Sequence, residues 1–179
     1  FAEKISNIIK NHLEKLEIAP NSAIITDSTA GVGGDTISFA KTFKYVNSIE
    51  ISEKRAKYLK NNVDIYDLHN VTVYNDDCNN ILNKLDNHNV IFIDPPWETV
   101  ESGSYKQYKN LRLKLGDIPL ETFCNNLMNK DTMMKIPELI VLKLPKNYDL
   151  IHFYKYVNNK DIYFYDLNKM IILVVITYF

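Results

Sequence analysis

The sequence is poor in cysteine and in net charge, and it contains no long apolar run. Its two cysteines, Cys78 and Cys124, have neither the number nor the spacing of a disulfide framework or a zinc site. The longest apolar stretch, residues 170–176, is far shorter than the roughly 18 residues that a membrane span needs. With no signal peptide visible, we expect an intracellular protein, nuclear or cytoplasmic, without a metal or a membrane attachment.

The balance of charge excludes a protein that is basic over its whole surface. The chain carries 21 basic and 22 acidic residues, a formal net charge of −1. Any contact with nucleic acid must therefore come from a local basic patch. With 179 residues, of which 46% are hydrophobic, the chain is long enough for one sizeable core, so we expect a single domain over residues 1–179.

Apolar periodicity along the chain predicts strands that alternate with helices. Short apolar runs predict strands at residues 23–26, 45–51, 71–74, 90–93 and 139–144. Helical spacing predicts helices at residues 2–16, 35–42, 52–62, 120–128 and 150–157, with a short one near 81–85. This alternation is typical of an α/β fold, a doubly wound sheet that is mostly parallel.

The C-terminal part of the sequence departs from this alternation. Strands are predicted at residues 162–165 and 170–178, with only the polar turn 166–169 between them. A connection this short requires an antiparallel pair, since a parallel pair needs a long crossover. We therefore expect a seven-stranded sheet that ends in an antiparallel hairpin. The long irregular segment 98–115 stands out as a functional loop, because such loops are uncommon in compact domains.

A glycine-rich loop follows the first predicted strand. Asp27 ends that strand, and Gly31 and Gly33 lie in the loop before a helix begins. Glycine lets the backbone approach a ligand closely, and the helix N-terminus adds amide donors. Glu50 ends the next strand, where a carboxylate can accept hydrogen bonds from both hydroxyls of a ribose. Asp27 can either order the loop or meet an ammonium group of a ligand.

The details of this loop favour S-adenosylmethionine over other nucleotide cofactors. Thr36 stands where the GxGxxG fingerprint requires its third glycine, and the GK[ST] of a phosphate loop is absent. S-adenosylmethionine has a ribose, an adenine and an α-amino acid but no phosphate. Asp76 or Asp77, after the third strand, can lie near the adenine, although a solvated turn at a strand end explains this pair almost as well.

The fourth predicted strand runs into Asp94-Pro95-Pro96-Trp97. In an open α/β sheet, ligands bind at the carboxyl ends of the strands. The two prolines stiffen the turn, so that Asp94 and a backbone carbonyl can accept the two N–H groups of an exocyclic amine. The only tryptophan of the chain offers a face on which a base can stack.

These segments resemble the RNA cap guanine-N2 methyltransferases, the trimethylguanosine synthase family of class I methyltransferases. The resemblance rests on DSTAGVGGDTISFA at residues 27–40, IDPPW at 93–97, LRLKLGDIPLE at 111–121, LKLPKN at 142–147 and the terminal LNKMIILVVITYF. It spans the whole chain. It implies a Rossmann-like methyltransferase fold, S-adenosylmethionine as cofactor, and RNA, at its capped 5′ end, as partner.

The resemblance implies a role for each of the following groups of residues. The cofactor would contact Asp27, Thr29, Ala30, Gly31, Gly33, Glu50, Asp76, Asp77 and Asp94. The catalytic turn would be Asp94, Pro95, Pro96 and Trp97, which grips the guanine amine and stacks on 7-methylguanine. The substrate would also contact Tyr105, Lys106, Arg112, Lys146 and Asn147, with Lys146 at the cap phosphates.

The sequence also departs from the family pattern directly after the catalytic turn. Glu98 and Thr99 replace the usual pair of glycines, which bears on cap selectivity. The basic residues 106–114 suit a 5′–5′ triphosphate and equally any RNA backbone. An amino-methyltransferase of rRNA, tRNA or DNA bases is therefore the alternative enzyme, and an inactive RNA- or partner-binding module is the alternative of another class.

Overall fold

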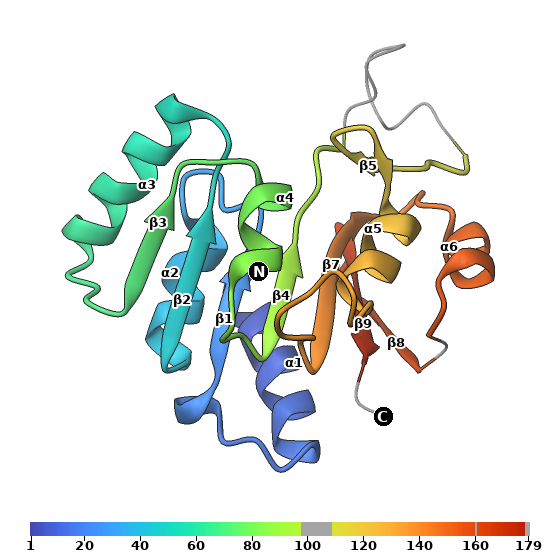
Figure 1. Ribbon diagram of the computed structural model, residues 1–179, viewed down its shortest axis with the longest axis horizontal. Coiled ribbons are helices and arrows are strands. Elements are labelled where there is room, and N and C mark those ends of the chain that lie inside the picture. Colours follow the sequence, from blue (N-terminus) through green and yellow to red (C-terminus); the bar gives the residue numbers. More distant parts are fainter. Residues whose placement is uncertain (98–108, 160, 178–179) are drawn as a thin grey trace.

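The computed structural model describes residues 1–97, 109–159 and 161–177, and its seven-stranded sheet confirms the predicted architecture (Figure 1). The strands follow the order β3-β2-β1-β4-β7-β9-β8. They are β1 (Ile24–Asp27), β2 (Tyr45–Ile49), β3 (Val71–Tyr74), β4 (Val90–Ile93), β7 (Leu139–Pro145), β8 (Ile162–Asp166) and β9 (Met170–Ile176). The first five of these pair in parallel, and β9 runs antiparallel between β7 and β8.

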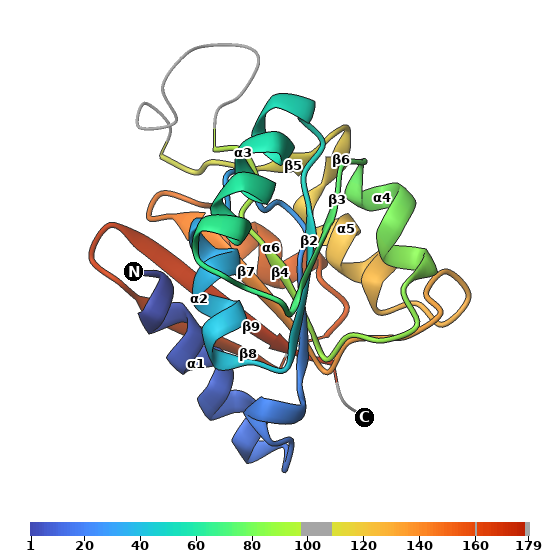
Figure 2. The same cartoon turned by 90° about the vertical axis from the view of Figure 1, so that its left-hand side faces the viewer.

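Helices cover both faces of the sheet, as the view along the sheet in Figure 2 shows. One face carries α1 (Ala2–Lys15), α2 (Gly34–Thr42) and α3 (Glu53–Ile65). The other carries α4 (Cys78–Ile81), α5 (Leu120–Leu127) and α6 (Leu150–Tyr156). Two short 3₁₀ turns, η1 (Pro20–Ser22) and η2 (Leu82–Lys84), precede β1 and follow α4. In the described residues, none of the helices has the length and apolarity that crossing a membrane requires.

The side chains of the central strands divide between two apolar cores. Ile25, Phe92 and Val141 pack with α1 and α2 on one face of the sheet. Ile93 and Leu142 pack with α5 and α6 on the opposite face. Because these strands are buried on both faces of the sheet, their sequences are continuous apolar runs, and these runs allowed the strands to be predicted.

A small hairpin that the sequence did not predict lies at the carboxyl edge of the sheet. It consists of β5 (Lys114–Leu115) and β6 (Ile118–Pro119), which pair antiparallel around Gly116. In the chain before it, Leu111, Leu113 and Leu115 are buried while the residues between them are exposed. This two-residue alternation anchors the hairpin to the core on the α5 side.

Gly33 fixes the start of α2 through its left-handed backbone. Its φ is 99°, and a Cβ built on it would lie 2.6 Å from Cδ1 of Leu59, a fully buried side chain. We predict that Gly33→Ala lowers the free energy of unfolding by about 2–4 kcal/mol, because both the backbone and Leu59 must shift.

Gly34→Ala is the matched control for this prediction. Apart from its chain neighbours and the backbone of its own helix, no atom lies within 4 Å of the added Cβ, and the residue is already in the helix. We expect urea unfolding to show equal or slightly higher stability, by up to about 1 kcal/mol. Equal stability of the two variants would contradict the constraint assigned to Gly33.

Candidate active site

A cleft of about 410 Å³ opens at the carboxyl ends of β1, β2 and β4. Its volume lies in the range of small-molecule sites. The glycine loop, the ends of β2 and β4, the N-terminus of α4 and the β5–β6 hairpin all contribute to it. The lining residues are Ser28, Thr29, Gly31, Ile49, Glu50, Ile51, Arg55, Asp77, Cys78, Asp94, Pro96, Leu115 and Gly116.

Glu50 is held rigidly at this cleft, with only 4% of its surface exposed. Its Oε2 accepts a hydrogen bond from the Gly31 amide at 2.9 Å, and its Oε1 accepts one from the Ser52 amide at 2.8 Å. The Arg55 guanidinium also contacts Oε1, with Nη2 at 2.8 Å. Arg55 Nε also donates to Oε1, at 2.9 Å, so Oε1 is fully engaged. Oε2 accepts only the Gly31 amide and keeps one acceptor position for a ribose hydroxyl. The sequence predicted Glu50 and Gly31 here but not Arg55.

Asp27 lies beneath the cleft and does not line it. Its Oδ2 accepts a hydrogen bond from the Thr36 hydroxyl at 2.6 Å, and that hydroxyl also lies 3.0 Å from Ser48 Oγ. Burial, with the nearby charge of Asp35, raises the pKa of Asp27 to about 7. Of the two roles that the sequence left open, the geometry favours ordering of the loop over direct contact with a ligand. The Oδ1 atom is buried with no hydrogen-bond partner among the described residues.

The glycine loop is fastened to the strands on both sides of it. The Ser28 hydroxyl donates to the Phe92 carbonyl at 2.7 Å, and the Thr29 hydroxyl accepts from the Asp94 amide at 2.7 Å. The Ala30 amide donates to the Ile49 carbonyl at 2.9 Å. Thr29 therefore lines the cleft as predicted, whereas Ala30 and Gly33 shape the loop from outside the lining.

The two acids after β3 have different surroundings. Asp77 lines the cleft and caps α4 by accepting a hydrogen bond from the Asn79 amide at 2.9 Å. Asp76 is exposed and outside the lining, and its Oδ1 accepts hydrogen bonds from the Asp77 amide and from Asn80. Of this pair, only Asp77 is therefore placed to contact a ligand in the cleft, and Asp76 forms a local turn.

The Asp94-Pro95-Pro96-Trp97 turn follows β4 at the same edge. Asp94 and Pro96 line the cleft, and Pro95 is buried beneath it. Trp97 is partly buried and packs against the core on the α5 side, outside the lining of the cleft. Burial raises the pKa of Asp94, and the charge of Lys143 opposes this shift.

Lys143 is a further residue at this site that was not predicted from the sequence. Its Nζ lies 2.8 Å from Oδ2 of Asp94 and 3.0 Å from Oδ2 of Asp35, the second residue of α2. The available signal was a lone lysine in the apolar strand LIVLKLP, where a charge needs a partner. That partner could not be identified before the strand order was known.

The predicted substrate residues on the described part of the chain are engaged with acids or with backbone. Arg112 pairs with Asp149 at 3.5 Å, and Lys146 pairs with Asp166 at 2.9 Å. The Asn147 carbonyl accepts a hydrogen bond from the Leu111 amide at 2.8 Å. The cation of each pair is exposed to solvent, so the pair contributes little net stability. A phosphate can therefore compete with the carboxylate for the cation.

Tyr105 and Lys106 lie outside the described residues, so their predicted contacts with substrate remain predictions. The contribution of Leu115 and Gly116 to the cleft was not predicted. It comes from the β5–β6 hairpin, for which the alternation of apolar and basic residues in LRLKL at 111–115 was the available signal.

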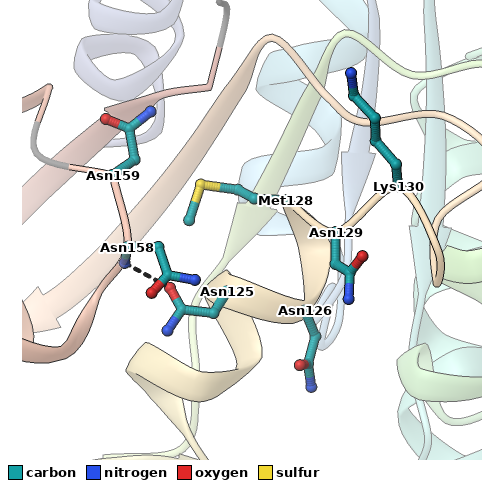
Figure 3. Close-up of a pocket in the computed structure, with 7 residues that line it drawn as sticks. All are labelled: Asn125, Asn126, Met128, Asn129, Lys130, Asn158 and Asn159. Atoms are coloured by element: carbon teal, nitrogen blue, oxygen red, sulfur yellow. Dashed lines mark hydrogen bonds between the residues drawn. The ribbon is translucent and has the colours of Figure 1, made fainter.

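A larger cleft, of about 740 Å³, lies between the end of α5 and the segment after α6 (Figure 3). Five of its seven lining side chains are asparagines, which neither titrate nor act as nucleophiles. The Asn158 amide donates to Asn125 Oδ1 at 2.7 Å, and Asn125 Nδ2 donates to the Tyr156 carbonyl at 3.0 Å. These bonds join α5 to α6, so the cleft at the carboxyl edge is the better site for chemistry.

The raised pKa of Asp27 predicts a pH-dependent cost in stability. Between pH 4 and pH 7 the folded protein holds a proton that the unfolded chain, with an ordinary aspartate pKa, has released. Stability therefore falls as pH rises through this window. A shift of three pH units corresponds to about 4 kcal/mol.

We predict that Asp27→Asn is more stable than the wild type at pH 8 by about 1–3 kcal/mol, since an unpartnered amide offsets part of the gain. The difference should shrink as the pH falls towards 4, because the unfolded wild-type carboxyl then begins to take up the proton that the folded protein already holds. Urea unfolding of both proteins from pH 4 to pH 8 measures it. A difference that does not change with pH would contradict the origin assigned to it.

Comparisons with known proteins identify the family of the chain. The family model of the RNA cap guanine-N2 methyltransferases matches residues 22–174. The chain is 38% identical over 195 residues to the uncharacterized protein L320 of Acanthamoeba polyphaga mimivirus, with 99% of this chain and 73% of that protein covered.

Solved structures share the fold at lower identity. An rRNA methylase from Streptococcus thermophilus superposes with a TM-score of 0.59 at 14% identity, covering 94% of this chain and 95% of that one. A Streptococcus mutans protein described as a methyltransferase and solved in complex with SAH (S-adenosylhomocysteine) gives 0.58 at 15% identity, covering 94% and 97%. The chain thus belongs to the RNA cap guanine-N2 methyltransferase family, and it is an S-adenosylmethionine-dependent methyltransferase.

Proposed function

We propose that the protein methylates the exocyclic N2 amine of guanine in the 7-methylguanosine cap of an RNA. The observation that carries this proposal is the position of the Asp94-Pro95-Pro96-Trp97 turn. It stands directly beside the cleft that Gly31 and Glu50 line, in a chain that the cap guanine-N2 family model matches over residues 22–174.

The residues of the cleft fit S-adenosylmethionine. Oε2 of Glu50 presents acceptor capacity to a ribose, and Asp77 lines the same cleft, where it would meet the adenine. The Gly31 amide fixes Glu50 in place. Bound there, the cofactor supplies an electrophilic methyl group on a sulfonium.

The turn supports the amine half of the proposal. The nitrogen lone pair of a guanine amine is delocalised into the base, so the amine is a poor nucleophile until its N–H groups are bound and oriented. Asp94 can accept one N–H through its carboxylate. The amide of Asp94 is bonded to Thr29, so the acceptor stands at a fixed position beside the cleft. Such positioning supplies a large part of the rate when two reactants are brought together.

Two further features of the substrate need partners, the positively charged 7-methylguanine base and the phosphates of the cap. The face of Trp97 would stack on the base with an added cation–π contribution. Lys146, which is exposed and follows β7 at the same edge, would exchange its contact with Asp166 for a phosphate. Arg112 would do the same at Asp149. Tyr105 and Lys106 belong to the proposed substrate contacts as well.

The decisive test is mass spectrometry of a 7-methylguanosine cap analogue, of unmodified GTP and of uncapped structured RNA after incubation with S-adenosylmethionine. We expect a gain of one or two methyl groups on the cap analogue alone. Methylation of the uncapped RNA alone would overturn the cap proposal in favour of an amino-methyltransferase of internal bases. Absence of binding to S-adenosylhomocysteine would favour an inactive module.

Two substitutions separate binding of the amine from binding of the base. We predict that Asp94→Ala lowers kcat on the cap analogue by at least about 100-fold, because the amine loses its positioned acceptor.

Trp97→Ala should act mainly on KM, raising it by roughly 5- to 150-fold, which corresponds to about 1–3 kcal/mol of lost stacking. Steady-state kinetics with circular dichroism as a folding control measure both variants. Near wild-type kcat for Asp94→Ala, or an unchanged KM for Trp97→Ala, would remove the role given to that residue.

A further inference from the structure

The contacts of Lys143 connect the two halves of the active site. The side chain is 17% exposed, and its Nζ lies between Oδ2 of Asp94 and Oδ2 of Asp35 at 2.8 and 3.0 Å. Asp94 belongs to the turn that would grip the amine, and Asp35 to the first turn of the helix after the glycine loop. One ammonium group therefore ties the amine side of the cleft to the cofactor side.

The strand register brings these groups together. Ile93 of β4 pairs with Leu142 of β7, so the next residues along the two parallel strands are Asp94 and Lys143. The start of α2 supplies Asp35, on the face of the sheet that α1 and α2 cover. The contact is thus a product of the fold and does not depend on a flexible surface side chain.

The charges that face Asp94 come from three elements. Asp35 on α2 and Asp27 on β1 repel its negative charge, and Lys143 on β7 attracts it. The nearby Trp97 side chain also favours the charged form. Burial disfavours that form most strongly. Without the ammonium group, the buried carboxyl would hold a proton to higher pH and would present a hydroxyl where the amine needs an acceptor.

We propose that Lys143 is a positioning residue for methyl transfer: its ammonium group holds the Asp94 carboxylate in place and maintains its negative charge, so that Asp94 can accept a hydrogen bond from the substrate amine. This role rests on the proposed function of Asp94. A carboxylate has about four acceptor positions, so the bond to Lys143 leaves capacity for the amine. Lys143 itself touches neither the methyl group nor the base.

The charge of Lys143 can be removed by Lys143→Met and retained by Lys143→Arg. The matched control is Lys135→Met, which deletes another lysine–carboxylate pair, with Glu138, just before β7 and away from the cleft. The pKa of Asp94 is read from its side-chain carboxyl carbon by NMR, which requires no substrate. The pH profile of kcat/KM is measured on whichever RNA or cap analogue the wild type methylates.

In Lys143→Met we expect the pKa of Asp94 and the acid limb of the kcat/KM profile to move up together by about one to three pH units. Lys143→Arg should restore most of the wild-type profile, and Lys135→Met should not move it. Loss of activity by an equal factor at every pH, with an unmoved pKa of Asp94, would overturn the proposal.

A second variant keeps the test informative if Lys143→Met does not fold. Asp35→Asn removes a like charge and frees Lys143 for Asp94, so the pKa of Asp94 should fall. A value that stays the same or rises would overturn the proposal. The NMR readings stand even if no cap analogue is methylated, so failure of the proposed substrate and failure of the role of Lys143 give different results.

Discussion

The active site depends on keeping charge at a place from which water is largely excluded. Asp27, Asp35 and Asp94 meet at the carboxyl edge of β1 and β4, and Lys143 stands against two of them. Burial of a carboxylate is costly unless a cation or hydrogen-bond donors compensate for it. Lys143 compensates the charges of Asp35 and Asp94. Asp27 receives only partial compensation, through the hydrogen bond from Thr36. The pKa of Asp27 is raised because the cost of burying its charge is not fully compensated.

The same edge is held together by short hydrogen bonds between neighbouring segments. Ser28 and Thr29 fasten the glycine loop to the end of β4, and Ala30 fastens it to β2. The Gly31 amide then fixes Glu50. The part of the site that would hold the cofactor and the part that would hold the amine therefore form one rigid unit. Rigidity here favours a reaction that relies on alignment of two bound groups.

Much of this was accessible from the sequence because the relevant signals are local. Apolar runs predicted the strands, and the short turn between the last two strands predicted the antiparallel hairpin. The positions of Gly31 and Glu50 at the ends of their strands predicted the cleft. The ion pairs were not accessible in this way. Lys143 meets Asp94 only because β4 and β7 are neighbours in one register, and a lone lysine in an apolar run does not reveal its partner. Asp76 was predicted beside Asp77 as a cofactor contact, but an acid after a strand can equally accept hydrogen bonds within its own turn, as Asp76 does.

The place of β9 in the sheet has a consequence for how the protein is made. β9 lies between β7 and β8, although it follows both in the chain. On the ribosome, β7 therefore emerges with one unpaired, apolar edge that stays open until residues 170–176 are free to enter. That open edge is a template for wrong pairing, and long-range insertion of a strand is slow. The half of the sheet that carries Lys143 is accordingly the half that we expect to fold last and to need protection from aggregation during synthesis.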